Sequence, residues 1–202
     1  MLKTRRARPQ LRDRIAFFKE FLKNPQQVAS VVPSSRFLER RVVEVAGVQA
    51  AGTVVELGAG TGGTTRAILG AMPRDAKLLS IEINSKFRAS LERIGDSRLV
   101  AHTGSAHELE EALSLHNLPA PEVVISGIPF SKIGRTSASR ILETISSVLV
   151  PGGRFVAYQL HKRVESLCRP FLGPARVAVE LRNIPPLRIY RWEKQAKMPD
   201  GI

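Results

Sequence analysis

A glycine-rich loop between an apolar segment and a helix limits the possible folds of this chain more than any other feature. Residues 53–57 (TVVEL) are typical of a buried strand, and residues 58–63 (GAGTGG) follow directly. Glycines let a backbone approach a ligand closely, and the helix predicted to run from there to about residue 71 offers unpaired N–H groups. Glu82 ends the next apolar segment, at a spacing where a carboxylate accepts hydrogen bonds from a ribose diol. These features together predict a nucleoside-binding α/β fold.

Strands and helices alternate after the loop. We predict strands at residues 77–83, 98–102, 122–126 and 154–160, and helices at residues 86–94, 106–115, 137–149 and 161–168. The last two predicted strands, near residues 175–182 and 187–193, are close in sequence and indicate a hairpin. Apolar strands in repeated β-α units predict a mostly parallel sheet with helices on both faces.

One more helix is expected before the first strand. A Pro-Ser-Ser sequence at residues 33–35 is a typical helix start with a serine as N-cap. Leu38, Val42 and Val45 form its apolar stripe, and Gly47 ends it.

The net charge of +13 is concentrated at the two ends of the chain. Residues 1–43 contain 11 Lys and Arg against 3 Asp and Glu, residues 44–160 are neutral, and residues 161–202 carry +5. This asymmetry favours a polyanionic partner, either nucleic acid or an anionic membrane surface. The alternative is that the basic residues have no partner and only keep the protein soluble.

Residues 11–23 predict an amphipathic helix with a wide apolar face and basic flanks. Such a helix suits a lipid interface, although packing of its aromatic side chains onto the core is the alternative. We expect four residues of this helix to contact the membrane: Arg14, Phe17, Phe18 and Phe21.

Several classes are not expected. The single cysteine, Cys168, allows no internal disulfide and favours a reducing compartment. No uncharged apolar stretch reaches the length of about 18 residues that a spanning helix needs. No Cys and His cluster has metal-ligand spacing, so no metal is expected.

The glycine spacing also fits dinucleotide enzymes, and Tyr158 and Lys162 match the Tyr-x-x-x-Lys pair of short-chain dehydrogenases. Tyr158, however, lies on a predicted strand, whereas that pair needs a helix. Residues 56–62 (ELGAGTG) instead resemble the first motif of class I S-adenosylmethionine (SAM) methyltransferases. Residues 81–84 (IEIN) resemble the second motif, and residues 151–153 (PGG) resemble the turn before the fifth strand.

This resemblance covers roughly residues 30–193. It implies a Rossmann-like seven-stranded sheet with a terminal antiparallel hairpin, SAM as cofactor and S-adenosylhomocysteine as product. It places Glu56 near the methionine amino group and Glu82 on the ribose. The other cofactor-binding residues that it implies are Gly58, Ala59, Gly60, Thr61, Gly62, Ile83, Ser105, Ala106 and Ser126. Ser105 stands where the family often has an acid, and its hydroxyl can still bond an adenine edge.

The acceptor is expected beside residues 126–130 (SGIPF), which follow the fourth strand. Enzymes that methylate adenine amines usually carry asparagine there, and this chain has none. The chain more closely resembles bacterial phospholipid N-methyltransferases, which convert phosphatidylethanolamine towards phosphatidylcholine, at residues 31–35, 126–129 and 183–190. This resemblance implies that the substrate contacts Gly127, Ile128, Pro129, Phe130 and Arg188. The candidates for holding or deprotonating the amine are Tyr158, His161 and Tyr190, and their alternative is a place in the core or at its rim.

The predicted organisation is a basic helical segment at residues 1–45, a methyltransferase domain at residues 46–193 and a loose tail at residues 194–202. The expected protein methylates a phospholipid amine, is cytoplasmic, and sits peripherally at the inner face of the membrane. A ribosomal RNA adenine dimethyltransferase, with nucleic acid as partner, is the alternative. A SAM-binding protein without catalysis is the third possibility.

Overall fold

The computed structural model of the chain describes residues 35–183 and 185–195. The predicted helix at residues 11–23, with Arg14, Phe17, Phe18 and Phe21, lies outside the described residues. So do residues 196–202 of the expected tail.

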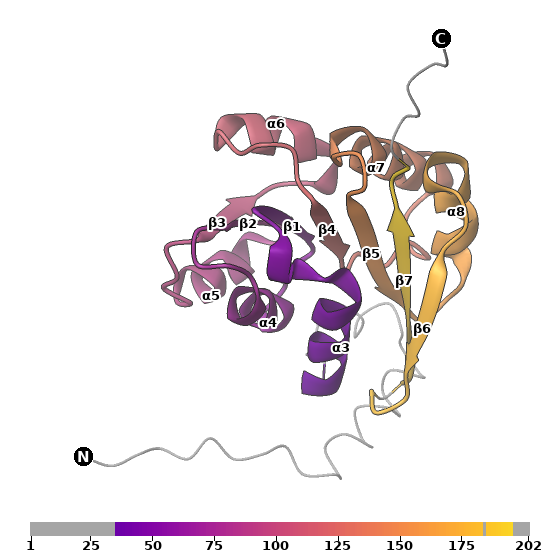
Figure 1. Ribbon diagram of the computed structural model, residues 1–202, viewed down its shortest axis with the longest axis horizontal. Helices are drawn as coiled ribbons and strands as arrows, with labels where there is room; N and C mark the ends of the chain where they lie inside the picture. The colour runs from indigo at the N-terminus through magenta and orange to yellow at the C-terminus, as the bar shows by residue number, and fades with distance from the viewer. Residues whose placement is uncertain (1–34, 184, 196–202) are drawn as a thin grey trace. The chain divides into compact units, whose positions relative to one another are not determined.

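A single seven-stranded sheet has the strand order β3-β2-β1-β4-β5-β7-β6 (Figure 1). Strands β1 to β5 are parallel, β7 is antiparallel to β5, and β6 is antiparallel to β7. The strands are β1 (Thr53–Leu57), β2 (Lys77–Glu82), β3 (Leu99–Thr103), β4 (Val123–Ser126), β5 (Arg154–Gln159), β6 (Arg176–Glu180) and β7 (Leu187–Glu193). The predicted Rossmann-like α/β fold, with its terminal antiparallel hairpin, is confirmed.

Helices cover both faces of the sheet, as the apolar strands predict. Residues of α3 (Arg36–Ala46) and α4 (Gly63–Ala71) are buried on one face, and residues of α6 (Leu109–Leu115), α7 (Arg135–Val148) and α8 (Arg163–Leu172) on the other. The short helix α5 (Arg88–Glu92) packs against β3. Three 3-10 turns complete the fold: η1 (Val48–Ala50), η2 (Ser85–Phe87) and η3 (Ala106–Glu108).

Helix α3 has the ends that its sequence predicts. The Ser35 hydroxyl accepts a hydrogen bond from the Leu38 amide, and Gly47 takes a left-handed conformation with φ of 63°. Leu38 and Val42 are fully buried in the same cluster as Ile189 of β7. The predicted domain boundary between residues 45 and 46 is therefore wrong, because α3 shares the core of the sheet.

The contacts of Lys194 bear on the other predicted boundary, between residues 193 and 194. Its amide donates to the Gly153 carbonyl, and its side-chain ammonium donates to the carbonyls of Ser147 and Leu149. The tail predicted to start at residue 194 is thus anchored at its first residue.

The carboxyl ends of the five parallel strands lie at one edge of the sheet, which we call the carboxyl edge. The β6–β7 loop reaches the same edge, because β7 runs antiparallel to β5 and pairs Arg188 with Gln159. The strand order reverses between β1 and β4. Ligands of open α/β sheets bind at such a switch point, outside the carboxyl ends of the strands.

Candidate functional site

The glycine loop lies at the switch point, directly after β1. Gly58, Gly60 and Gly62 have φ values of 81°, 53° and 82°, which side chains rarely adopt. The Gly58 amide donates to the Ile81 carbonyl at 2.8 Å and fixes the loop against β2. A Cβ built on Gly60 meets nothing within 4 Å, so the bare backbone faces open space. The five predicted loop residues, 58–62, therefore lie together, with Thr61 exposed and Ala59 nearly buried.

Glu82 lies beside the loop at the end of β2. Its Oε2 accepts from the Gly60 amide at 2.8 Å, and its Oε1 accepts from the Asn84 amide at 2.9 Å. The first bond holds the carboxylate against the loop, and the second ties it to the turn after β2. The next side chain, Ile83, is 75% exposed and offers an apolar surface at the same strand end. A carboxylate next to an apolar platform suits a ribose and its base.

Glu56 is buried beneath the start of α4 and is 1% exposed. Its Oε2 accepts from the hydroxyls of Thr65 at 2.6 Å and Ser80 at 2.7 Å. Its Oε1 has no hydrogen-bond partner among the described residues. Burial raises the pKa of Glu56 to about 7, although the two hydroxyls oppose the shift. An unpaired buried carboxylate oxygen fits a cationic group such as an amino group.

Glu39 of α3 is a site residue that sequence reasoning missed. Its carboxylate lies against Gly63, the first residue of α4, so closely that any side chain there would collide with it. Burial raises the pKa of Glu39, while Arg66 and Arg36 lower it. The sequence contains a signal for this position. Glu39 precedes the apolar Val42 and Val43 by three and four residues, so it lies near the buried face of the helix. The charges of Glu39 and Glu82 add to the burial that raises the pKa of Glu56, and a cationic ligand bound among the three carboxyl groups would relieve this repulsion.

Ser105 and Ala106 lie at the end of β3, next to β2. The Gly104 amide donates to the Glu82 carbonyl at 3.1 Å, which places the two strand ends side by side. The Ser105 hydroxyl accepts from the His107 amide and caps η3, in a capping box with Glu108. Ala106 is nearly buried. The structure thus brings Ser105 to the same edge as Glu82, and its contact with a base stays a prediction.

The loop after β4, the predicted acceptor loop, is held by several hydrogen bonds. The Gly127 amide donates to the Leu57 carbonyl, and the Ile128 amide donates to the hydroxyl of Ser126. The buried Gln159, which sequence reasoning missed, donates its side-chain amide to the Ile128 carbonyl at 2.7 Å. A Cβ on Gly58 would contact the Ile128 side chain at 3.4 Å. The acceptor loop and the glycine loop therefore touch.

Tyr158 joins these loops to α4. Its phenol lies against Gly127, where a Cβ would collide with the hydroxyl, and the hydroxyl is 3.4 Å from the Thr64 hydroxyl. Tyr158 lies on β5 and Lys162 precedes α8, so the two do not share a helix as the dehydrogenase pair requires. The structure places this predicted catalytic residue between the two loops.

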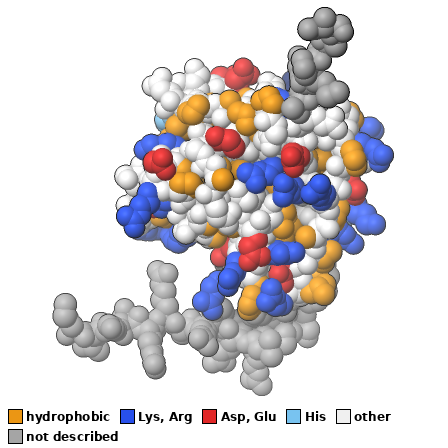
Figure 2. All heavy atoms as spheres, viewed as in Figure 1, with side chains coloured by type: hydrophobic (Ala, Val, Ile, Leu, Met, Phe, Trp, Pro, Cys, Tyr) orange, Lys and Arg blue, Asp and Glu red, His pale blue; other side chains and the backbone are white. Residues whose placement is uncertain are grey.

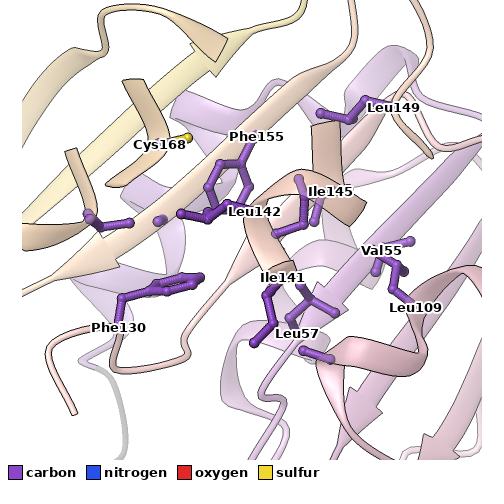
Figure 3. Packing of buried hydrophobic residues seen from close by; sticks show 14 of the residues in the cluster. Val55, Leu57, Leu109, Phe130, Ile141, Leu142, Ile145, Leu149, Phe155 and Cys168 are labelled. Carbon is purple, nitrogen blue, oxygen red and sulfur yellow. The ribbon is translucent and has the colours of Figure 1, made fainter. Parts of the chain in front are cut away.

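Two predicted site residues lie in the core instead. Phe130 is fully buried among the residues packed under α7 and α8 (Figure 3), because the tight turn from Phe130 to the Ile128 carbonyl directs its ring inward. Tyr190 is fully buried and stacks on Trp192 with ring centroids 5.7 Å apart. The predictions that Phe130 lines the acceptor pocket and that Tyr190 holds the amine are wrong, because neither side chain is accessible.

The remaining predicted residues stand around the carboxyl edge. Pro129 and His161 are exposed, and His161 comes two residues after the end of β5. The Arg188 guanidinium donates to the Leu160 carbonyl at 3.2 Å. No group of three or more His, Cys, Asp or Glu side chains in the described part of the chain lies together as a metal site would need. Within residues 35–183 and 185–195, no helix is long and apolar enough to span a bilayer.

The strand order, the antiparallel β7 and the glycine loop beside Glu82 define the class I SAM-dependent methyltransferase fold. Solved structures share it: 1,6-didemethyltoxoflavin-N1-methyltransferase of Burkholderia thailandensis, with bound S-adenosylhomocysteine, aligns with a TM-score of 0.60 and 13% identity over 96% of this chain and 94% of that one. This likeness shows the fold.

No family model matches the chain. The ornithine lipid N-methyltransferase of Singulisphaera acidiphila is 27% identical over 183 residues, which are 89% of this chain and 95% of that protein. Ribosomal RNA small subunit methyltransferase A of Maricaulis maris is 33% identical over 97 residues, which are only 46% of this chain and 32% of that protein.

Proposed function

We propose that this chain is a SAM-dependent N-methyltransferase that methylates the amine of a membrane lipid, at the inner face of the membrane. The observation that carries the proposal is the unpaired, buried Glu56 oxygen beneath a glycine loop that touches the predicted acceptor loop. The similarity to an ornithine lipid N-methyltransferase along nearly the whole of both chains supports a lipid amine as acceptor.

The residues around the glycine loop fit SAM. Glu56 and Glu39 would hold the cationic methionine amino group, and Glu82 would accept from the ribose hydroxyls. Ile83 and Ser105 would contact the base, the first by its exposed apolar surface and the second by its hydroxyl. Bound SAM supplies a methyl group on a sulfonium, which is a good leaving group, so the protein's contribution is mainly orientation.

Tyr158 is the residue that we assign to the lipid amine. Its hydroxyl lies between Thr64 and Gly127, where the glycine loop and the acceptor loop meet. An amine with a pKa of about 10 must lose a proton before it attacks. Tyr158 would hold the neutral amine in line, and the exposed His161 would take its proton to solvent.

The lipid class is the finer part of the proposal. Phosphatidylethanolamine and ornithine-containing lipids both present a primary amine, and only the first adds a phosphate. Arg188, whose guanidinium donates to the Leu160 carbonyl near the end of β5, would bind the phosphate of phosphatidylethanolamine, and the same group would bind the carboxylate of an ornithine lipid, so the vesicle assay below decides between them. The basic helix predicted at residues 11–23 would hold the protein on the anionic leaflet.

Ribosomal RNA is the second candidate acceptor, because 97 residues match a ribosomal RNA methyltransferase at 33% identity. Against it, Ser126 begins the acceptor loop, where adenine-specific enzymes usually carry asparagine. The buried Ser126 hydroxyl already accepts from the Ile128 amide, so it is used inside the loop.

The deciding experiment supplies methyl-labelled SAM with one acceptor at a time. The acceptors are vesicles containing phosphatidylethanolamine, vesicles containing ornithine lipid, phosphatidylcholine vesicles and under-methylated small-subunit ribosomal RNA. We expect label in an amine lipid and none in phosphatidylcholine. Label in RNA alone would overturn the lipid assignment, and SAM binding by calorimetry without any transfer would leave a binding protein.

A further inference from the structure

We propose that Gln159, at the end of β5, is a positioning residue for methyl transfer. Its side-chain amide holds the acceptor loop against the glycine loop and so sets where the lipid amine lies relative to the methyl group of SAM. The inference rests on the proposed function and adds to it a residue that acts through the acceptor loop.

Gln159 is a buried polar residue on an otherwise apolar face of its strand. It is 5% exposed, and the residues that precede it on the same face, Phe155 and Ala157, belong to the core under α7 and α8. In Figure 2, charged side chains are spread over the visible face of the described domain, where water can pair with polar groups. A buried amide lacks that water and costs free energy unless the protein pairs it. Gln159 is too buried to hold a lipid itself, so its role lies in the hydrogen bond that it makes.

The hydrogen bond from Gln159 is more than the carbonyl of the acceptor loop needs. The Ile128 carbonyl accepts from the Phe130 amide at 2.9 Å and from the Gln159 side-chain amide at 2.7 Å. One partner already satisfies a buried carbonyl, although its oxygen has two lone pairs. Burial of this carbonyl therefore does not by itself require Gln159. The second bond adds a connection from β5 to the acceptor loop, across 31 residues of sequence.

This connection fixes Ile128 at the point where the two loops touch. A Cβ on Gly58 would lie 3.4 Å from the Ile128 side chain and 3.5 Å from the Ile128 amide, so Ile128 packs against the first residue of the glycine loop. The buried ring of Phe130 anchors the other end of the turn in the core (Figure 3). Without the bond from Gln159, the turn would keep its anchor at Phe130 but lose the contact that holds Ile128 towards β5.

Gln159 also lies in line with the arginine that we assign to the anionic group of the lipid. Arg188 is directly opposite Gln159 in the β5–β7 pair, and β4, which carries the acceptor loop, lies on the other side of β5. Adjacent strands are about 4.8 Å apart, so the row of acceptor loop, Gln159 and Arg188 sets the spacing between the two ends of a headgroup. The rate of an in-line transfer depends steeply on such alignment. A small shift of the acceptor loop should therefore slow transfer more than it weakens binding.

The test compares the full parent chain with Gln159→Met, which nearly keeps the size of the side chain and removes the donor. Gln159→Leu, which also lacks a donor, is measured in parallel. Ser146→Ala is the matched control, because the Ser146 hydroxyl also donates to a distant carbonyl, that of Phe171, but from the last turn of α7. Methyl transfer from labelled SAM to vesicles of the amine lipid that the parent chain methylates gives kcat and KM, and calorimetry gives the affinity for SAM.

We expect kcat to fall about tenfold in both Gln159 variants, while KM and the affinity for SAM stay within about twofold of the parent values. Ser146→Ala should keep the parent kcat. An unchanged kcat in both Gln159 variants, a loss explained by weaker SAM binding, or an equal loss in Ser146→Ala would overturn this inference alone. A parent chain that transfers methyl groups to no lipid would remove the proposed function, and this inference with it.

A double-mutant cycle tests whether Gln159 acts through Ile128. Ile128→Ala removes the side chain that touches the glycine loop and keeps the carbonyl that Gln159 binds. If the hydrogen bond works by placing Ile128, the two losses in kcat should not combine, and the chain with Gln159→Met and Ile128→Ala should be about as slow as Ile128→Ala alone. Losses that multiply would contradict the proposed route.

Discussion

The phenol of Tyr158 lies against Gly127, so the first residue after β4 leaves room for no side chain. The contact joins β5 to the acceptor loop, and the Tyr158 hydroxyl reaches to 3.4 Å from Thr64 at the start of α4. One side chain therefore connects the part of the site that we assign to SAM with the part that we assign to the amine.

Tyr158→Phe keeps the ring and removes the hydroxyl. We expect kcat for methyl transfer to fall about tenfold, the effect of one lost hydrogen bond in the transition state, with little change in SAM affinity. Tyr190→Phe is the matched control, because the buried Tyr190 hydroxyl has no partner among the described residues. Steady-state kinetics of both variants check the assignment, and equal activity loss in both would contradict it.

Glu39→Gln removes the carboxylate that lies against Gly63. We expect SAM to bind about five- to tenfold more weakly, because a charge-assisted hydrogen bond to its amino group becomes a neutral one. Glu44→Gln on the same helix is the control, since Glu44 is exposed and pairs with Arg40 and Arg41. Calorimetric titration with SAM measures both. Unchanged affinity in Glu39→Gln would mean that Glu39 has only a structural role.

Glu56 makes the stability of the ligand-free protein depend on pH. Burial raises its pKa from 4.5 to about 7, so between these values the folded chain holds a proton that the unfolded chain has lost. Stability should therefore fall as pH rises from about 5 to about 7, by on the order of 3 kcal/mol at most. Urea unfolding at several pH values checks this, and Glu56→Gln should flatten the dependence.

The pKa of Asp96 is shifted in the opposite direction from that of Glu56. Hydrogen bonds from Arg98 hold the pKa of Asp96 at about 2, below its ordinary value of 3.8. Its contribution to stability is present above pH 4 and is lost as pH falls towards 2. Asp96→Asn should therefore lower stability by a constant amount above pH 4, flatten the fall between pH 4 and pH 2, and leave the slope between pH 5 and pH 7 unchanged. A change of the Glu56 slope in this variant would show that the two effects had been assigned to the wrong groups.

SAM binding should also titrate with Glu56. The deprotonated carboxylate attracts a cation, so affinity should rise as pH increases through about 7, and binding should release a proton. Calorimetry in buffers of different ionisation enthalpy measures that proton. A pH-independent affinity with no proton release would place the methionine amino group elsewhere.

The aromatic residues predicted to contact the membrane need a separate variant. Replacing Phe17, Phe18 and Phe21 by serine should lower sedimentation with anionic vesicles several-fold, because the apolar face of the predicted helix is removed. Transfer to a lipid in detergent micelles should be unaffected. Binding equal to that of the parent chain would show that residues 11–23 are not the anchor.

Local sequence patterns were sufficient for the strands and the glycine loop. The strands predicted at residues 53–57 and 187–193 coincide with β1 and β7. Ser35 and Gly47 lie at the two ends of α3, as predicted. Both results follow because helix caps and strand alternation are short-range signals. Phe130 was misassigned because one tight turn decides whether its ring faces a pocket or the core. Tyr190 was misassigned because its face of the sheet is covered by α8, which no local pattern reports.

The missed residues act across long sequence separations. Glu39 reaches Gly63 from another helix, and Gln159 bonds a carbonyl 31 residues earlier. Such contacts depend on how α3 and β5 pack against the sheet. Sequence patterning identifies both residues only as polar positions on otherwise apolar elements.

The hydrogen bond from the Ser35 amide to the Asn183 side chain joins residues 148 positions apart. The side-chain amide of Asn183 also donates to the Pro185 carbonyl. Asn183 therefore connects the start of α3 to the loop of the terminal hairpin. Ribosomal synthesis produces that hairpin after the glycine loop. The hydrogen bond that ties the start of this helix to the hairpin loop can therefore form only after Asn183 has been synthesised. A nascent chain that already contains the complete glycine loop still lacks this tie to the helix that carries Glu39.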